Sequence, residues 1–256
     1  MTESDKRVAI FVDGEGFIYM LRNLFHPGEF HRADYLPRQA KWGWFFDSIG
    51  EALGAQTVQV YWYSIRELDY FPEGNWHRMP FEIAERKLRN FPAIEERLDA
   101  QSSKRERKQV VNEFRETIPK MREKMEARLI EWHELQDQIT QDSPKVKIRR
   151  PGWQACSLVN SVLHEEKAVD VGMVVDMLSK SDDFDIAVLL TADGDFVPAV
   201  KELRRRGKEN ACLYFQGSLT RKGPRIARRL TKEMNYVIDL PIADLAAFMG
   251  VTLVEE

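Results

Sequence analysis

The residues best suited to chemistry are aspartates that follow two short apolar runs. Asp13 comes directly after Val8–Val12, and Asp193 and Asp195 come directly after Ile186–Thr191, within Thr-Ala-Asp-Gly-Asp-Phe. The carboxyl ends of parallel strands meet at one edge of a sheet, where ligands bind. If both runs are parallel strands, the three carboxylates are expected to be neighbours.

A further carboxylate, Asp170, opens a helix predicted to begin at Val171. Asp176 follows six residues later, roughly 240° around that helix, so we expect it to lie outside the same site. A simpler explanation exists for each carboxylate: Asp170 and Asp195 could cap the helices they precede, and Asp13 could close a turn.

Capping does not explain why carboxylates accumulate at two neighbouring strand ends. Like charges brought together in a cleft cost free energy unless a cation or a proton compensates them. Hard oxygen ligands suit Mg²⁺ or Mn²⁺ better than zinc. Such ions promote phosphodiester hydrolysis because they lower the pKa of the attacking water and neutralise charge on the phosphate.

Strand patterns alternate with helical ones, which predicts an α/β fold with a mostly parallel sheet and helices on both faces. Helical spacing predicts that Val171, Val174, Val175 and Leu178 form one buried helix face, and that Phe196, Val200 and Leu203 form another. The predicted strands are Val8–Val12, Thr57–Tyr63, Val146–Arg149, Ile186–Thr191 and Ala211–Phe215.

Residues 66–145 are predicted to be an inserted, charged helical hairpin or bundle between the two parts of the main domain, 1–65 and 146–256. Between Glu82 and Asp137 the chain carries 13 Lys or Arg and 13 Asp or Glu, and Pro92 and Pro119 are expected to break this run. The insertion could form a homodimer, recruit a protein partner or stand as a solvated monomeric hairpin. The expected apolar seam consists of Leu88, Phe91, Ile94, Leu98, Phe114, Ile118, Met121, Met125, Leu129, Trp132 and Leu135.

Composition describes a folded protein: the chain has 256 residues, 43% of them hydrophobic, and a net charge of −3. We expect a cytoplasmic protein with no membrane segment, because the apolar runs are short or carry charges. Charge is unevenly spread, since residues 199–232 hold 11 basic and two acidic side chains. This segment suits a polyanion, although arginines on solvated helices are the simpler interpretation.

Three motifs in this order resemble the NYN family of PIN-like nucleases. They are Val-Asp-Gly at 12–14, Lys-Ala-Val-Asp-Val at 167–171 with Asp176 after it, and Thr-Ala-Asp-Gly-Asp-Phe at 191–196. The resemblance covers residues 7–65 and 146–240 and leaves the charged insertion out. It implies a PIN-like fold, a Mg²⁺ or Mn²⁺ site of clustered aspartates, and hydrolysis of RNA.

The resemblance also implies roles for single residues. Asp13, Asp170 and Asp193 would bind metal directly, and Asp195 would bind through water or orient its neighbours. Thr191 would hold either a water molecule at the metal or the Asp13 carboxylate. The residues expected to meet RNA phosphates are Lys167, Arg221, Lys222 and Arg225.

One position departs from the family pattern. NYN proteins commonly carry Asn two residues after the first Asp-Gly, whereas here the run is Asp13-Gly14-Glu15-Gly16. A weakly active RNA-binding or scaffold protein is therefore the main alternative to a nuclease. A haloacid-dehalogenase-like phosphatase is disfavoured because position 15 is Glu, and a dinucleotide-binding turn is disfavoured because its third glycine is missing.

The expected reaction is metal-dependent attack of water on an RNA phosphodiester, which leaves a 5′-phosphate and a 3′-hydroxyl group. Aromatic side chains could stack unpaired bases, which favours single-stranded RNA, or they could belong to the core. These side chains are Trp42, Trp44, Phe45, Phe46 and Trp153.

Overall fold

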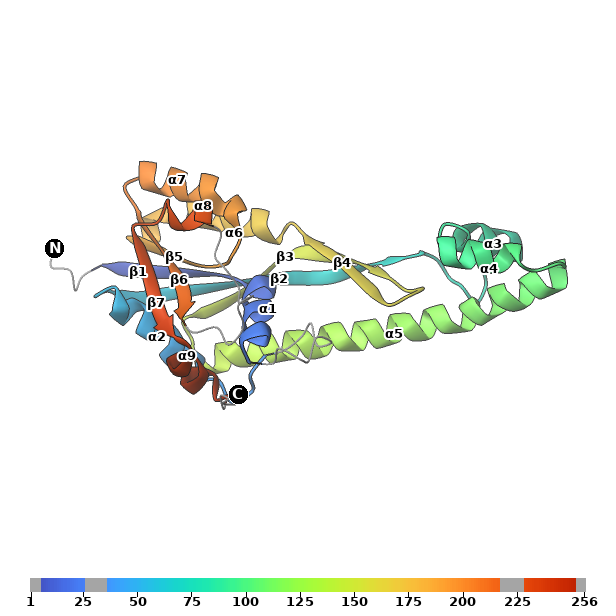
Figure 1. Ribbon diagram of the computed structural model, residues 1–256, viewed down its shortest axis with the longest axis horizontal. Coiled ribbons are helices and arrows are strands. Elements are labelled where there is room, and N and C mark those ends of the chain that lie inside the picture. The colour runs from blue at the N-terminus through green and yellow to red at the C-terminus, as the bar shows by residue number, and fades with distance from the viewer. Residues whose placement is uncertain (1–5, 26–35, 217–227, 252–256) are drawn as a thin grey trace. The chain divides into compact units, whose positions relative to one another are not determined.

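The computed structural model describes residues 6–25, 36–216 and 228–251 (Figure 1). The chain forms two compact units. Unit 1 consists of Met1–Arg66, Trp132–Gly152 and Ala168–Glu256, and unit 2 of Glu67–Glu131 and Trp153–Lys167. The predicted division into 1–65, 66–145 and 146–256 stays a prediction.

The described residues form an α/β structure with one mostly parallel sheet. The strands are β1 (Arg7–Asp13), β2 (Gln56–Phe71), β3 (Val146–Ser157), β4 (Val162–Lys167), β5 (Ile186–Leu190), β6 (Glu209–Gln216) and β7 (Tyr236–Pro241). The helices are α1 (Gly14–Phe25), α2 (Trp42–Ala52), α3 (Phe81–Leu88), α4 (Pro92–Asp99), α5 (Lys104–Asp142), α6 (Val169–Ser179), α7 (Val197–Arg205), α8 (Arg228–Thr231) and α9 (Ile242–Met249), with the short 3₁₀ helices η2 (Ser181–Asp183) and η3 (Gly194–Phe196).

The strand order is β4-β3-β2-β1-β5-β6-β7. The pairs β1–β2, β1–β5, β5–β6 and β6–β7 are parallel, and β3–β4 is antiparallel. All five predicted strands are present, while β4, β7 and the outer parts of β2 and β3 are not among them. The order reverses at β1, which lies between β2 and β5, so the carboxyl ends of β1 and β5 form the switch point where ligands bind in such sheets.

The central strand β1 is buried on both faces, so unit 1 has layers on each side of its sheet. Its residues Val8 to Val12 are all at most 2% exposed, as expected for a parallel strand covered on both faces. Val8, Ile10 and Val12 belong to a core with side chains of α1, α2 and α9. On the opposite face, the Phe11 ring packs against Tyr61 and Phe184. Figure 1 shows α6 and α7 on one side of this sheet and α2 and α9 on the other.

The predicted buried face of α6 is wrong. Val171 and Val175 are 66% and 57% exposed, whereas Val169, Met173 and Met177 are buried. Apolar residues occur on several sides of this helix, so spacing alone did not fix its rotation. Two contacts determine the rotation of α6. Asp176 is buried on the inner face together with its ion partners. Gly172 lies so close to Pro151 that a Cβ at position 172 would be 2.6 Å from Pro151 Cβ. By contrast, the predicted buried positions Phe196, Val200 and Leu203 are confirmed.

Unit 2 has its own hydrophobic core. Leu88, Ile94, Leu98, Ile118 and Met125 of the predicted seam are buried there, although Trp132 and Leu135 pack against the unit 1 core instead. The inserted hairpin is not confirmed, because residues 66–145 contain three helices. Pro92 begins α4, but the expected break at Pro119 is absent, since α5 continues through it.

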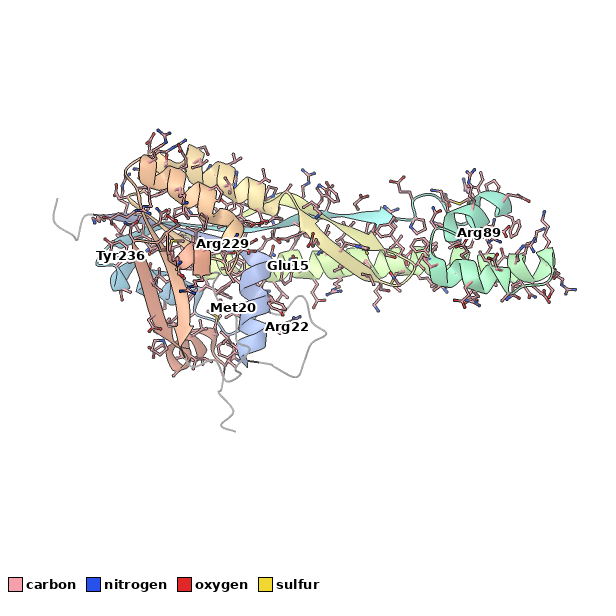
Figure 2. The ribbon with its side chains drawn as sticks, turned by 45° about the horizontal axis from the view of Figure 1, so that its top comes forward. Glu15, Met20, Arg22, Arg89, Arg229 and Tyr236 are labelled. Atoms are coloured by element: carbon pink, nitrogen blue, oxygen red, sulfur yellow. The ribbon has the colours of Figure 1, made fainter. Side chains whose placement is uncertain are left out.

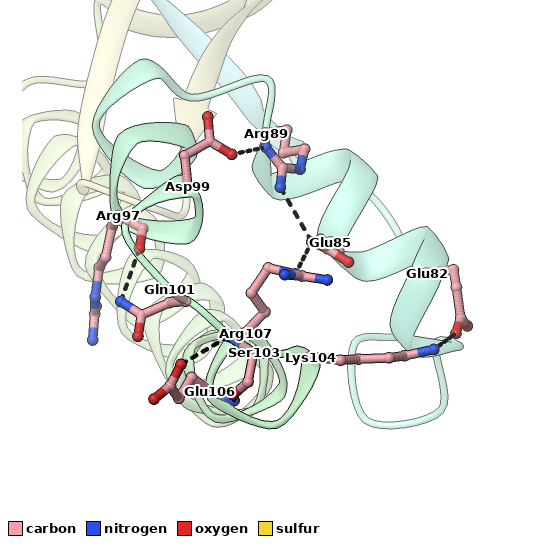
Figure 3. A network of polar contacts seen from close by, with 10 residues as sticks. All are labelled: Glu82, Glu85, Arg89, Arg97, Asp99, Gln101, Ser103, Lys104, Glu106 and Arg107. Carbon is pink, nitrogen blue, oxygen red and sulfur yellow. Dashed lines mark hydrogen bonds and ion pairs between the residues drawn. The ribbon is translucent and has the colours of Figure 1, made fainter.

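Ion pairs between α3, α4 and α5 cover the surface of unit 2 (Figure 3). Arg89 contacts Glu85 and Asp99, and Arg107 also contacts Glu85 at 3.1 Å. Exposed ion pairs each contribute about 0–1 kcal/mol, so this network adds little stability. The network pairs acidic side chains of one helix with basic side chains of a neighbouring helix. This pairing is consistent with the equal numbers of acidic and basic residues between Glu82 and Asp137.

No helix in the described part of the chain combines the length and the apolar character that a membrane crossing requires.

Truncations on α6 test which of its faces is buried. We expect Met173→Ala to lower the free energy of unfolding by about 2–5 kcal/mol, because it leaves a cavity in the core. We expect Val171→Ala to change it by less than about 0.5 kcal/mol, because that side chain is exposed. Urea unfolding of both variants measures the difference, and a larger loss for Val171→Ala would contradict the observed rotation of α6.

Candidate active site

Asp13 ends β1 at the switch point, and two hydrogen bonds hold its carboxylate. The Gly16 amide donates to Asp13 Oδ1 at 3.0 Å, and the Thr191 hydroxyl donates to Asp13 Oδ2 at 2.9 Å. Gly16 lies in the first turn of α1, where backbone amides have no partner within the helix. Asp13 therefore caps α1 and is fixed between the ends of β1 and β5.

The segment after β5 continues this hydrogen-bonded chain. Thr191 is buried, and its hydroxyl oxygen accepts from the Asp193 amide at 3.2 Å. The Asp193 carboxylate in turn accepts from the Asp195 amide at 2.9 Å and so caps η3. The expected cap by Asp195 is absent, because Asp195 lies inside η3 and no side chain caps α7. These bonds fix Thr191, Asp193 and Asp195 in a tight turn beside Asp13.

Asp170 lies in the first turn of α6, where its side chain makes no capping bond. Partial burial raises the pKa of the Asp170 carboxyl group, and the negative charges of Asp13, Asp193 and Asp195 raise it further. All four predicted aspartates therefore interact through their charges.

The Asp13 carboxyl group is also destabilised in its charged form. Burial raises its pKa most, and the charges of Glu15 and Asp193 add to the effect. The hydrogen bonds from Gly16 and Thr191 only partly offset this rise. Glu15 is exposed at the start of α1 (Figure 2), so it adds negative charge to the site without being buried in it.

Asp176 belongs to a different polar cluster, as expected from its position on the helix. Its carboxylate accepts from the Tyr63 hydroxyl at 3.0 Å and pairs with Arg149 at 2.9 Å and Lys180 at 2.7 Å. Burial alone raises the pKa of Asp176, but its hydrogen bonds from Lys180 and Tyr63 and the charge of Arg149 outweigh burial and lower it. This cluster joins α6 to β2 and β3.

Tyr63 and Arg149 were not identified from the sequence as parts of the site. In the parallel register Tyr63 lies opposite Asp13, so its bond to Asp176 ties the helix that carries Asp170 to the strand beside Asp13. The sequence offered one hint of this cluster: Asp176 is a charged residue among the apolar positions of α6. A buried carboxylate requires ionic or hydrogen-bonding partners.

The structure gives a reason for Gly16. A Cβ at this position would lie 2.9 Å from Asp13 Cγ, closer than real side chains approach. Any larger residue at position 16, including the Asn common in the resembled family, would require the Asp13 carboxylate to move. Gly16 is therefore coupled to the orientation of Asp13.

The donor atoms fit a hard divalent ion in their chemistry, because all four side chains supply carboxylate oxygens. The raised pKa values of Asp13 and Asp170 also indicate uncompensated negative charge. Among the described residues, however, no group of three or more His, Cys, Asp or Glu side chains is arranged as a ready ligand set. The Asp13 oxygens are occupied by Gly16 and Thr191.

The predicted RNA contacts at Lys167, Arg221, Lys222 and Arg225 stay predictions. Lys167 lies in unit 2 and pairs with Glu165 at 2.9 Å. Arg221, Lys222 and Arg225 lie outside the described residues.

The aromatic side chains proposed for base stacking divide into two groups. Trp42, Phe45 and Phe46 belong to the unit 1 core. Trp44 and Trp153 are 65% and 38% exposed, and the Lys41 ammonium group lies 4.5 Å from the centre of the Trp44 ring.

Comparison with known proteins identifies the family. The model of the NYN domain matches residues 99–241, more than half of the chain. The chain belongs to the NYN domain family. NYN domains are part of the PIN-like nuclease superfamily, so the PIN-like fold is confirmed. The matched segment contains Asp170, Asp193 and Asp195 and begins after Asp13; it also includes residues 99–145, which the predicted resemblance left out.

Other comparisons add little to the NYN assignment. No curated protein matches this chain. A crystal structure of a protein of unknown function from Vibrio parahaemolyticus is 12% identical, with a TM-score of 0.44, and the alignment covers 94% of this chain and 96% of that one.

Removing the Asp170 charge tests the repulsion among the aspartates. An acid with a raised pKa in the folded state loses stability as the pH rises above its unfolded value of about 4, and the loss is complete above the folded pKa. We therefore expect Asp170→Asn to raise the melting temperature at pH 7 by about 1–3 °C, and the gain to vanish near pH 3.5.

The helix dipole predicts the opposite sign, because a negative charge in a first turn stabilises by about 0.3–1 kcal/mol. Asp69→Asn, at an exposed position in unit 2, is the control and should show no such gain. A lower melting temperature for Asp170→Asn at pH 7 would mean that the helix dipole outweighs burial and repulsion, and would contradict a net cost of the Asp170 charge.

Thr191→Val tests the hydrogen-bonded chain at the strand ends. It removes the donor to Asp13 and leaves the Asp193 amide without its acceptor, which we expect to cost about 1–3 kcal/mol of unfolding free energy. Urea unfolding measures this loss. Thr117→Val, at an exposed position in α5, should cost less than about 0.5 kcal/mol, and equal losses would show that the Thr191 hydroxyl has no special role.

Proposed function

We propose that this NYN protein is a divalent-metal-dependent endoribonuclease whose reaction takes place at Asp13, Asp170, Asp193 and Asp195. The observation that carries the proposal is the electrostatic coupling of these four carboxylates at the switch point of the sheet. A folded protein has no stability reason to gather them, because burial, and then the charges of neighbouring carboxylates, raise the pKa values of Asp13 and Asp170. Membership of a superfamily of nucleases supports the same conclusion.

The aspartates would bind Mg²⁺ or Mn²⁺, with Asp13, Asp170 and Asp193 as direct ligands and Asp195 as a water-mediated ligand or an orienting group. When bound, the ion lowers the pKa of water and neutralises charge on the phosphate. Thr191 orients the Asp13 carboxylate, and the Asp193 side chain keeps the turn at η3 closed. The Asp176 cluster holds α6, and therefore Asp170, against the sheet.

In the proposed reaction, a water molecule attacks the phosphorus of one RNA phosphodiester. The bond between this phosphorus and the 3′-oxygen breaks. The oxygen of the attacking water stays on the phosphorus, and the leaving 3′-oxygen takes up a proton. The products are a 5′-phosphate and a 3′-hydroxyl group, and no protein side chain serves as nucleophile. We propose single-stranded RNA as the substrate, with the exposed Trp44 as a candidate for stacking on an unpaired base.

A catalytically weak RNA-binding or scaffold protein is the second candidate. Two observations favour it: the described residues hold no ready three-ligand group, and position 16 is Gly. In that case unit 2, which has its own core, would bind a second copy of the chain or another protein. This candidate does not explain why the four aspartates are kept together.

Cleavage of labelled single-stranded RNA tests the nuclease directly. We expect cleavage with Mn²⁺ or Mg²⁺, none with EDTA, and a loss of about 10²-fold or more in Asp193→Asn, because the variant lacks one of the carboxylates that would hold the ion. Asp69→Asn, prepared in the same way, should cleave like the wild type.

The chemistry of the product ends gives a second criterion. The proposal predicts that the downstream fragment carries a 5′-phosphate, which a phosphate-specific 5′-exonuclease would detect. A 2′,3′-cyclic phosphate, or equal activity of the wild type and Asp193→Asn, would rule out the proposed reaction.

A further inference from the structure

Among the described residues, most cations of the basic segment 199–232 lie on or directly after α7 and α8. Four cations on or directly after α7 are paired within unit 1, where they share two carboxylates: Arg205 and Arg206 pair with Glu202 at 2.7 and 2.9 Å. Lys201 and Arg204 pair with Glu233 at 3.4 and 3.2 Å. The excess of positive charge in the sequence therefore overstates what α7 offers to a ligand.

The cations of α8 differ. Arg228, Arg229 and Lys232 are exposed, and none of them forms an ion pair with the described residues. Leu230, between them, is fully buried and anchors the turn. The Thr231 hydroxyl donates to the Arg228 carbonyl at 3.1 Å, and the Glu233 amide donates to the Leu230 carbonyl at 3.0 Å. These contacts fix α8 while its arginine side chains face solvent; Figure 2 labels Arg229 on it.

The position of α8 connects it to the aspartates. This helix packs against η3, the turn that contains Asp195. The α8 cations therefore lie on an element that packs beside the acidic turn. Two guanidinium groups that have no ion-pair partner among the described residues, next to a carboxylate cluster, can bind an anion that bridges both regions, as an RNA strand would.

We propose that Arg228 and Arg229 bind the phosphate groups of RNA next to the phosphodiester at the aspartates. This inference rests on the proposed function, because it extends the same site along the strand. The contacts are to the backbone, so they hold and orient the strand without reading its sequence. Lys232 adds positive charge to the same surface.

RNA binding in EDTA separates this proposal from the reaction, since no cleavage is expected there. The double variant Arg228→Ala, Arg229→Ala should bind a single-stranded oligoribonucleotide about tenfold more weakly at low salt. The slope of log K against log salt concentration should fall by about 1.4, because each lost phosphate contact to a single strand removes about 0.7. Fluorescence anisotropy with a labelled oligonucleotide measures both quantities.

Arg86→Ala, Arg105→Ala is the matched control, since both arginines are exposed in unit 2 and the pair removes the same charge. The control should bind like the wild type. Arg228→Lys, Arg229→Lys should keep most of the salt slope, and an unchanged melting temperature would show that α8 still folds. Equal losses in the two double-alanine variants, or no loss in either, would overturn the proposal.

The two proposals fail in distinguishable ways. If the wild type cleaves RNA and the α8 variant binds and cleaves equally well, the α8 site is wrong and the nuclease stands. If binding depends on α8 but no cleavage occurs with any divalent metal, the phosphate site stands and the nuclease is wrong. If both are right, the α8 variant should raise KM about tenfold and leave kcat within about twofold, because its contacts hold the strand before and during the reaction.

Discussion

Repulsion between carboxylates at the ends of two adjacent parallel strands is the constraint on which the site depends. Asp13 ends the central strand, Asp193 and Asp195 follow its neighbour, and Asp170 comes from α6, which packs against the central strand. Ionising these groups together costs free energy, as the raised pKa values of Asp13 and Asp170 indicate. The surrounding structure must therefore hold them in place, and a cation would relieve the cost.

Hydrogen bonds from uncharged groups and a separate ionic cluster keep the four aspartates in place. The Gly16 amide and the Thr191 hydroxyl fix Asp13, while backbone amides fix the turn that carries Asp193 and Asp195. The buried Asp176 is neutralised by Arg149 and Lys180 and is bonded to Tyr63, so it anchors α6. Asp176 is thus a structural carboxylate with a lowered pKa, only six residues from one with a raised pKa.

The sequence predicted the strands well, because runs such as Val8–Val12 are continuous and end at polar residues. It also predicted that Asp13 and Asp193 would be neighbours, since that follows from parallel topology. It failed for the rotation of α6, where apolar residues occur on several sides and tertiary contacts of Asp176 and Gly172 decide. It failed at Pro119 as well: α5 continues through this proline, whose neighbour Ile118 is buried in the unit 2 core. The pairing of the α7 arginines and the exposure of those on α8 depend on side-chain positions that charge counting cannot give.

The most direct test of the account is a calorimetric titration of the full chain with Mn²⁺, with Asp13→Asn beside the wild type. The account predicts saturable binding by the wild type that weakens as the pH falls, because the ligands must be deprotonated. It predicts that this binding is lost or greatly weakened in Asp13→Asn. The absence of saturable Mn²⁺ binding by the wild type, or equal binding by the variant, would contradict a divalent-ion site built by the aspartates.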